Sequence, residues 1–139
     1  MLVEEELTDI KQLRSLAVDF LDNGGGSGEE FCDYCQGDRD PRSSDNPEKA
    51  IISLKNDRET EYKVYIAVQN ELVAAYNVLR NREFARLYPN EGLTYVEADL
   101  KYSDPRTSID DKSDLKEKLD VIKSLYPQKL SEAEPSKVN

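Results

Sequence analysis

The sequence contains two cysteines, Cys32 and Cys35, and their CxxC spacing is its clearest chemical feature. Thiols at this spacing can bind a metal ion, act as a redox centre, or join each other in a disulfide. A structural zinc ion needs four ligands, but the chain has no histidine and no second CxxC pair, so carboxylates or a second chain would have to complete the site. The neighbouring acids Glu29, Glu30 and Asp33 oppose thiolate formation and therefore redox activity.

Carboxylates are the other abundant reactive groups, because the chain has 29 Asp and Glu residues against 19 Lys and Arg. Adjacent pairs such as Glu29–Glu30 and Asp110–Asp111 are compatible with general acid–base catalysis. In so acidic a chain such pairs are expected without function, and both fall in predicted loops or helix starts. The lack of histidine also excludes a Ser/His/Asp triad within one chain. We therefore predict a protein that is not an enzyme, with no catalytic, cofactor-binding or metal-binding residues.

The formal net charge of −10 opposes binding to phosphate backbones and to anionic membrane surfaces. Nucleic-acid binding is therefore not expected. Arg80, Arg82 and Arg86 form a local basic cluster that could engage an acidic partner, although a solvated helix face is the simpler interpretation. No window of the sequence holds the ~20 apolar residues that cross a bilayer, and the amino terminus lacks the pattern of a signal peptide.

Helical spacing of apolar residues predicts a first helix of about four turns, with Thr8 as its cap and Asp9 as its first residue. Its apolar stripe contains Ile10, Leu13, Ala17, Phe20 and Leu21, and Asn23 and Gly24 end it. The next segment, 24–47, is rich in Gly, Ser, Asp and Pro and has no hydrophobic period. This composition predicts a surface insertion, which carries both cysteines.

The run from Ala50 to Leu54 is short and mostly apolar, which predicts a strand buried on both faces. A long helix is expected after it, capped at Thr60 and extending to about Tyr88. Its apolar stripe contains Val64, Val68, Leu72, Ala75 and Leu79. A strand over Tyr62–Ala67 is the alternative at its start, because valine and isoleucine favour strands.

The apolar pattern weakens after Pro89 and predicts a second insertion over about 89–112. A short helix from about Asp110 to Leu125 and an edge strand from Gln128 to Ala133 follow, and residues 136–139 are predicted to be a disordered tail. Alternating strands and helices predict one domain over residues 1–135. Its class would be α/β or α+β, with two or three helices packed on a small sheet.

The segment IISLKNDRETEY, residues 51–62, resembles the core of the ExbD/TolR family of biopolymer transport proteins. In that family an apolar strand ends in an aspartate, a basic or polar residue follows, and a tyrosine five positions after the aspartate opens a long helix. Asp57, Arg58 and Tyr62 match this pattern. The resemblance covers roughly residues 2–23, 50–82 and 126–135, and it leaves both insertions uncovered.

The resemblance implies a non-enzymatic periplasmic module of a single-pass inner-membrane protein. Such proteins form a proton channel with an ExbB/TolQ-like partner and energise a TonB/TolA-like transducer for outer-membrane transport or envelope integrity. It also implies a homodimer of the full-length protein, peptidoglycan contact in TolR-like members, and a transmembrane helix upstream of Met1 that carries the family's proton-linked aspartate. In this chain Asp57, Arg58 and Tyr62 would be structural or partner-facing positions, and no cofactor is implied.

A periplasmic location also bears on the cysteines, because that compartment favours disulfides. We therefore expect a Cys32–Cys35 disulfide as a local staple, with free thiols as the alternative. A function from another class stays open as well. It is a free-standing soluble binding protein whose CxxC insertion recognises a metal or a partner, and one equivalent of bound zinc per chain would favour it.

Overall fold

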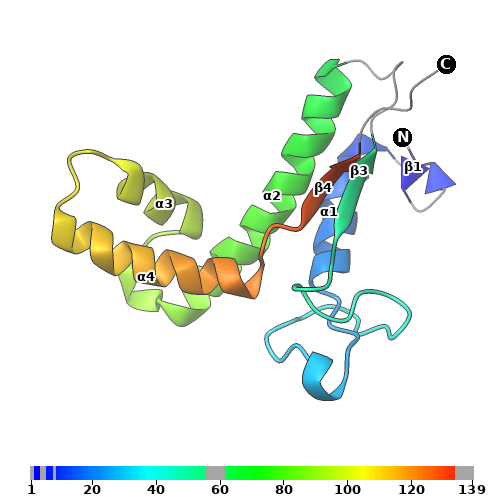
Figure 1. Ribbon diagram of the computed structural model, residues 1–139, viewed down its shortest axis with the longest axis horizontal. Coiled ribbons are helices and arrows are strands. Elements are labelled where there is room, and N and C mark those ends of the chain that lie inside the picture. The colour runs from blue at the N-terminus through cyan, green and yellow to red at the C-terminus, as the bar shows by residue number, and fades with distance from the viewer. Residues whose placement is uncertain (1, 4–5, 8, 56–61, 134–139) are drawn as a thin grey trace.

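The computed structural model describes residues 2–3, 6–7, 9–55 and 62–133. Within these residues, four α-helices form most of the regular structure, and the longest of them, α2, is the spine of the molecule (Figure 1). The elements in chain order are β1 (Leu2–Val3), β2 (Glu6–Leu7), α1 (Ile10–Leu21), η1 (Gly28–Glu30), β3 (Ile52–Lys55), α2 (Tyr62–Leu87), η2 (Pro89–Glu91), α3 (Tyr95–Ser103), α4 (Ile109–Leu125) and β4 (Leu130–Ala133).

Helix α1 has the predicted extent, but its cap lies one residue later than expected. Asp9 is the N-cap, in extended conformation, and its carboxylate accepts a hydrogen bond from the Lys11 backbone N–H at 3.1 Å. Asp9 is therefore not the first helical residue, and Thr8 lies outside the described residues. Leu13, Ala17 and Leu21 are buried, because residues four apart share one face of a helix.

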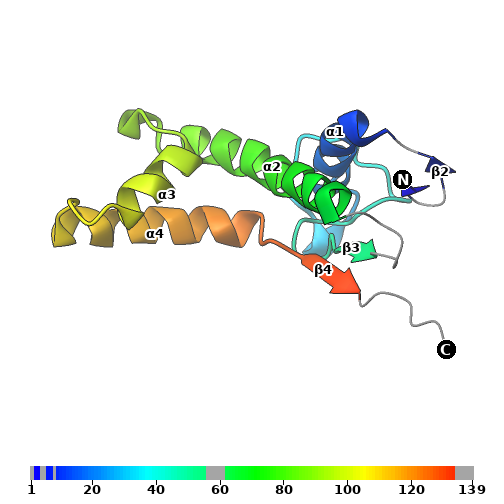
Figure 2. The same cartoon turned by 90° about the horizontal axis from the view of Figure 1, so that it is seen from above.

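Helix α2 is helical from Tyr62, so the alternative of a strand over Tyr62–Ala67 is wrong. The predicted stripe is buried from Val68 onward, whereas Val64 is 42% exposed. The predicted cap, Thr60, lies outside the described residues. Figure 2 shows that α2 runs from the α1 end of the molecule to the α3–α4 end.

Two separate hydrophobic cores lie along α2. The first is formed by α1, the first part of α2, and residues before β3 and after α4; its buried members are Leu13, Ala17, Leu21, Ala50, Val68, Leu72, Ala75, Tyr76, Leu79 and Tyr126. The second lies between the end of α2 and the α3–α4 pair; its buried members are Phe84, Tyr95, Ala98, Leu115, Leu119 and Ile122. Helix α2 therefore contributes to two packed units, which we call bodies, each built around one of these cores.

The segment 89–112 was predicted to be an irregular insertion. This prediction is wrong, because the segment contains α3. Thr94 and Glu97 form a capping box in which the Thr94 hydroxyl accepts from the Glu97 N–H and the Glu97 carboxylate accepts from the Thr94 N–H. Tyr95 and Ala98 then face the second core. Helix α4, which follows, has nearly the predicted bounds and is capped by the Ser108 hydroxyl.

The predicted α/β or α+β class, with helices packed on a small sheet, is also wrong, because the described part of the chain is mostly helical. Its strands form only two short pairs: β1 with β2, antiparallel, and β3 with β4, parallel. The two pairs do not join, and a ladder of four residues cannot form a layer that supports several helices. Ile51 is 59% exposed, so the segment of β3 is not buried on both faces either.

Among the described residues, none of the helices combines the length and the hydrophobicity required to span a membrane.

Candidate functional site: the α2–α4 joint

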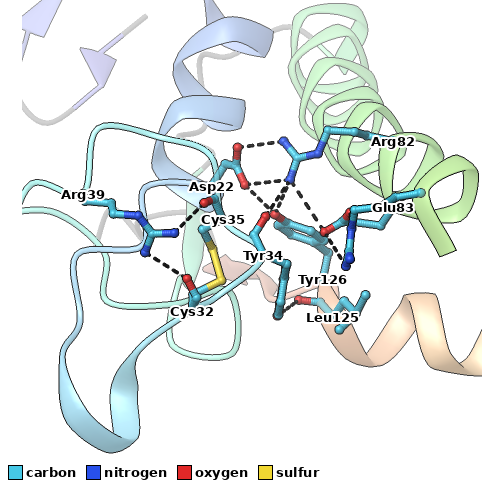
Figure 3. Close-up of polar contacts among 10 residues, drawn as sticks. Asp22, Cys32, Tyr34, Cys35, Arg39, Arg82, Glu83, Leu125 and Tyr126 are labelled. Carbon is cyan, nitrogen blue, oxygen red and sulfur yellow. Dashed lines mark hydrogen bonds and ion pairs between the residues drawn. A yellow bond between two sulfur atoms is a disulfide. The ribbon is translucent and has the colours of Figure 1, made fainter.

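Polar side chains, most of them buried, gather where the end of α1, the last two turns of α2 and the carboxyl end of α4 meet. We call this cluster the α2–α4 joint; it comprises Asp22, Arg80, Arg82, Glu83, Arg86 and Tyr126. Figure 3 shows Asp22, Arg82, Glu83 and Tyr126 converging beside the loop that carries the cysteines. The joint lies between the two hydrophobic cores, because Tyr126 belongs to the first core and Phe84, next to Glu83, belongs to the second.

Asp22 and Arg82 form the centre of the joint. Arg82 donates from Nη1 to Asp22 Oδ2 at 2.8 Å and from Nη2 to Asp22 Oδ1 at 3.0 Å, so the pair is two-pronged. Asp22 is only 5% exposed. Burial alone would lower the pKa of Arg82, but the hydrogen bonds to Asp22 outweigh it and raise that pKa. Arg82 therefore stays charged.

Tyr126 completes the pair from the other side. Its hydroxyl donates to Asp22 Oδ1 and accepts from Arg82 Nη2 at 3.0 Å. The residue is fully buried, and burial followed by the bond to Asp22 raises the pKa of its phenol. The phenol therefore stays protonated at neutral pH and holds the residue after α4 against the end of α1.

Glu83 is a second buried carboxylate in the joint, with its side chain fully covered. Arg86 donates to it from Nε at 2.6 Å and from Nη2 at 3.4 Å, and Arg82 Nη2 lies 3.8 Å from it. The hydrogen bonds to Glu83 raise the pKa of Arg86. A buried charge is tolerated only when it is paired, and Glu83 has two cationic partners.

Arg80 binds the main chain instead of a carboxylate. Its Nε and Nη2 both donate to the Tyr126 carbonyl, at 3.1 and 2.9 Å, and its guanidinium lies over the rings of Tyr76 and Tyr95. The carbonyls at a helix carboxyl end carry partial negative charge, which a cation stabilises. The basic cluster of the sequence is thus directed inward, and its interpretation as a solvated face or as a partner site is wrong for Arg80 and Arg82.

The loop that carries the cysteines closes the joint on the solvent side. Cys32 and Cys35 form a disulfide, with an S–S distance of 2.08 Å, and each is 3% exposed. Arg39 donates to the carbonyls of Cys32, Cys35 and Gly24 at 2.9, 2.7 and 3.3 Å, so one guanidinium organises the ring. Both cysteines are therefore buried within the predicted surface insertion.

Asn23 attaches the rest of this loop to the end of α1. Its amide donates to the carbonyls of Asp40 and Ser44 at 2.9 and 2.7 Å, and its side-chain oxygen accepts from the Asp40 N–H. Gly37 lies against the backbone of Asp22: a Cβ there would lie 2.5 Å from the Asp22 carbonyl oxygen. Glycine is therefore required at position 37 by close approach.

The contacts of the joint hold elements of the fold together. General acid–base catalysis needs a pKa close to the working pH, whereas the pKa values of Tyr126, Arg82 and Arg86 are all raised further above neutrality. Among the described residues no group of three or more Cys, Asp or Glu side chains is arranged to bind a metal ion. The geometry fits a structural junction between two bodies.

Of the three family-motif positions, only Tyr62 lies among the described residues, and it is not part of the joint. Asp57 and Arg58 lie outside the described residues, and Tyr62, the first residue of α2, is 78% exposed. Motifs do not reveal Asp22 or Tyr126, but two local signals point to the joint. Arg82 takes the next position of the α2 stripe, three after Leu79, and Asp22 lies at a helix carboxyl end, where a negative charge needs a compensating cation.

Comparison of the chain with protein-family models, with curated proteins and with solved structures found no match.

Proposed function

We propose that this chain is a non-enzymatic periplasmic module of an inner-membrane proton-motive-force transducer, of the ExbB–ExbD–TonB or TolQ–TolR–TolA type. Its partners would be an ExbB/TolQ-like channel protein and a TonB/TolA-like transducer, and the full-length protein would be a homodimer, with peptidoglycan as a further ligand. The module would transmit a conformational change, because its central helix supports two bodies and a polar joint connects them.

The observation that carries this proposal is how the cores are divided along the sequence. Every buried residue of the first core lies within segments 2–23, 50–82 and 126–135, which are the segments similar to the ExbD/TolR family. Every buried residue of the second core lies within 83–125, which the resemblance leaves uncovered. The similar segments, although dispersed along the chain, thus build one body, as a shared ancestral unit would.

The disulfide is consistent with the proposed location. Disulfides persist in the periplasm and other oxidising compartments and are rare in reducing ones. Both sulfur atoms are bonded to each other here, so this form of the protein offers no thiolate for a metal. The proposal does not rely on a sheet. It rests on the helical body formed by α1 and α2 with the β3–β4 pair.

The proposal is tested first by the gene. It expects one apolar segment of about 20 residues upstream of Met1 that contains a carboxylate. A reading frame that starts at Met1, with no such segment before it, contradicts the proposal. A free-standing binding protein that uses the loop 24–47 would then be the better interpretation, and zinc analysis of purified protein would separate its metal-binding form from its partner-binding form.

A further inference from the structure

Tyr34 lies inside the ring closed by Cys32 and Cys35 and reaches α4 from there. Its hydroxyl donates to the Leu125 carbonyl at 2.6 Å, across 91 positions of the chain. Leu125 is the last residue of α4, whose final carbonyls have no partner within the helix. The ring of Tyr34 also packs edge-on against Tyr126, with 5.5 Å between centroids (Figure 3).

The main chain of Tyr34 contacts the other side of the joint. Its carbonyl oxygen lies 3.4 Å from Arg82 Nη2. Tyr34 therefore connects the cysteine ring to α2 through its carbonyl and to α4 through its hydroxyl. The disulfide fixes its position, because only Asp33 and Tyr34 lie between the bonded cysteines and two of the ring's carbonyls accept hydrogen bonds from Arg39.

The space around the ring is tightly filled. A Cβ at Gly24 would lie 2.7 Å from Cys35 Cβ, and Gly24 has a φ of +65°, which favours glycine. Arg39 itself has a φ of +55°, a conformation that is uncommon for a residue with a side chain. The loop encloses the ring closely in this strained geometry. We therefore expect that opening the disulfide changes the position of Tyr34.

We propose that the Cys32–Cys35 disulfide is a redox-sensitive latch that holds the carboxyl end of α4 to the rest of the protein through Tyr34. In the oxidised form Tyr34 is fixed against Leu125 and Tyr126. A dithiol reductant opens the latch: its two thiols pass two electrons and two protons to the protein disulfide, leaving two cysteine thiols, and the reductant closes its own disulfide. This inference does not depend on the proposed function.

Opening the latch should loosen α4 selectively. Arg80 and Arg82 still hold Tyr126 from α2 in the reduced protein, so α4 stays attached but opens more often. The loss of one hydrogen bond of typical net strength, ~1 kcal/mol, raises an opening equilibrium about fivefold. The amino-terminal half of α1 is joined to α2 by the Arg14–Glu71 pair, which does not involve the ring, so exchange there should change little.

Hydrogen–deuterium exchange of the whole protein, oxidised and in dithiothreitol, tests this. We expect backbone amides near the end of α4, residues 119–126, to exchange about fivefold faster after reduction, while amides in the amino-terminal half of α1 keep their rates. An intact mass higher by two hydrogens verifies reduction. The latch is refuted if the rates of α4 are unchanged, or if all helices accelerate equally, since the disulfide would then serve only the loop or only global stability.

Variants of Tyr34 and of the two cysteines distinguish the effect of the Tyr34 hydroxyl from the effect of the disulfide. Tyr34→Phe in the oxidised protein removes the hydroxyl bond to Leu125 and should accelerate exchange at the end of α4 without reductant, whereas Tyr62→Phe, at an exposed tyrosine, should not. The double variant Cys32→Ser, Cys35→Ser should have the exchange rates of the reduced wild type, and dithiothreitol should not change them. A Tyr34→Phe protein that matches the oxidised wild type, yet still responds to reduction, would show that the latch does not act through this hydroxyl and would overturn the proposal.

Discussion

Asp22 and Arg82 are 60 positions apart in the sequence, yet two hydrogen bonds, of 2.8 and 3.0 Å, join the carboxylate to the guanidinium. The pair connects the residue that ends α1 to the last two turns of α2, and Asp22 accepts a hydrogen bond from the Tyr126 hydroxyl beyond α4. Three helices that pack on different cores are thereby fixed at one point. Directed polar contacts specify this geometry more narrowly than hydrophobic packing alone, which tolerates shifts of register.

Removing either charge of this pair should destabilise the protein strongly. Arg82→Met leaves the buried carboxylate of Asp22 without its cationic partner, and Asp22→Asn removes the carboxylate that binds Arg82 through two hydrogen bonds. We expect each change to lower the free energy of unfolding by urea by about 3 kcal/mol. Arg106→Met is the control, because Arg106 makes a similar pair with Asp104 but its side chain is 91% exposed; a loss below about 1 kcal/mol is expected there. Equal losses at the two sites would show that burial of the joint contributes nothing.

The raised pKa of Tyr34 should make the free energy of unfolding depend on pH in the alkaline range. Burial, followed by the charges of Glu48 and Glu83, raises its pKa in the folded protein from 10.0 to about 12. A raised pKa contributes stability that is complete below the unfolded value and is lost as the pH rises through the folded value. The free energy of unfolding should therefore fall as the pH rises from about 10 to about 12.

Tyr34→Phe isolates this contribution. The variant has no proton to lose at this position, so its free energy of unfolding should fall less steeply between these pH values than that of the wild type. Part of the slope remains, because Tyr126 also has a raised pKa. Urea titrations at several pH values measure the two slopes, and identical slopes would contradict the burial of the Tyr34 phenol.

Substituting alanine for Gly37 or for Gly28 should lower stability for different reasons. At Gly37 a Cβ would meet the Asp22 backbone at 2.5 Å, so Gly37→Ala requires a backbone shift beside the joint and should destabilise by about 2–3 kcal/mol. Gly28 has nothing within 4 Å but a φ of +60°, so Gly28→Ala should cost only about 1 kcal/mol, from backbone strain. Thermal unfolding of both variants gives the order, and a larger loss for Gly28→Ala would contradict the close packing at Gly37.

The second core should contribute to overall stability through α4. Leu119 is 2% exposed, and Leu119→Ala should destabilise by about 2–4 kcal/mol through lost burial and a cavity. Val121, on the same helix, is 42% exposed, and Val121→Ala should change stability by less than about 1 kcal/mol. Circular dichroism during urea unfolding measures both, and a Leu119→Ala protein as stable as the wild type would show that α3 and α4 are not packed as described.

Local patterns predicted the helices with a sustained apolar period and failed where pairing between distant segments decides the fold. The stripes of α1, α2 and α4 are readable because residues three and four apart share a face. Helix α3 has only Tyr95 and Ala98 buried, too few for a period, although its Thr94–Glu97 capping box is a readable start signal. The expected sheet depended on long-range pairing, and the strands are too short to build it.

The pairing within the joint could not be predicted from the sequence, because nothing local tells which of 29 carboxylates meets which of 19 cations. Arg82 resembles its neighbours Arg80 and Arg86 in type, but its position on the buried stripe of α2 is the distinguishing feature. Asp22 becomes interpretable only when a cation is known to lie opposite. The cysteine ring was expected to be a surface staple, whereas its burial against α4 depends on contacts across 91 positions.

The central claim, that this chain is a module of a proton-motive-force transducer, is tested most directly by purifying its full-length gene product from detergent-solubilised membranes through a carboxyl-terminal affinity tag. The expected result is co-purification of an ExbB/TolQ-like channel protein in a defined stoichiometric ratio, retained in the Tyr34→Phe variant and lost when the segment upstream of Met1 is deleted. Recovery of the tagged protein from the soluble fraction, without a channel protein, would contradict the claim.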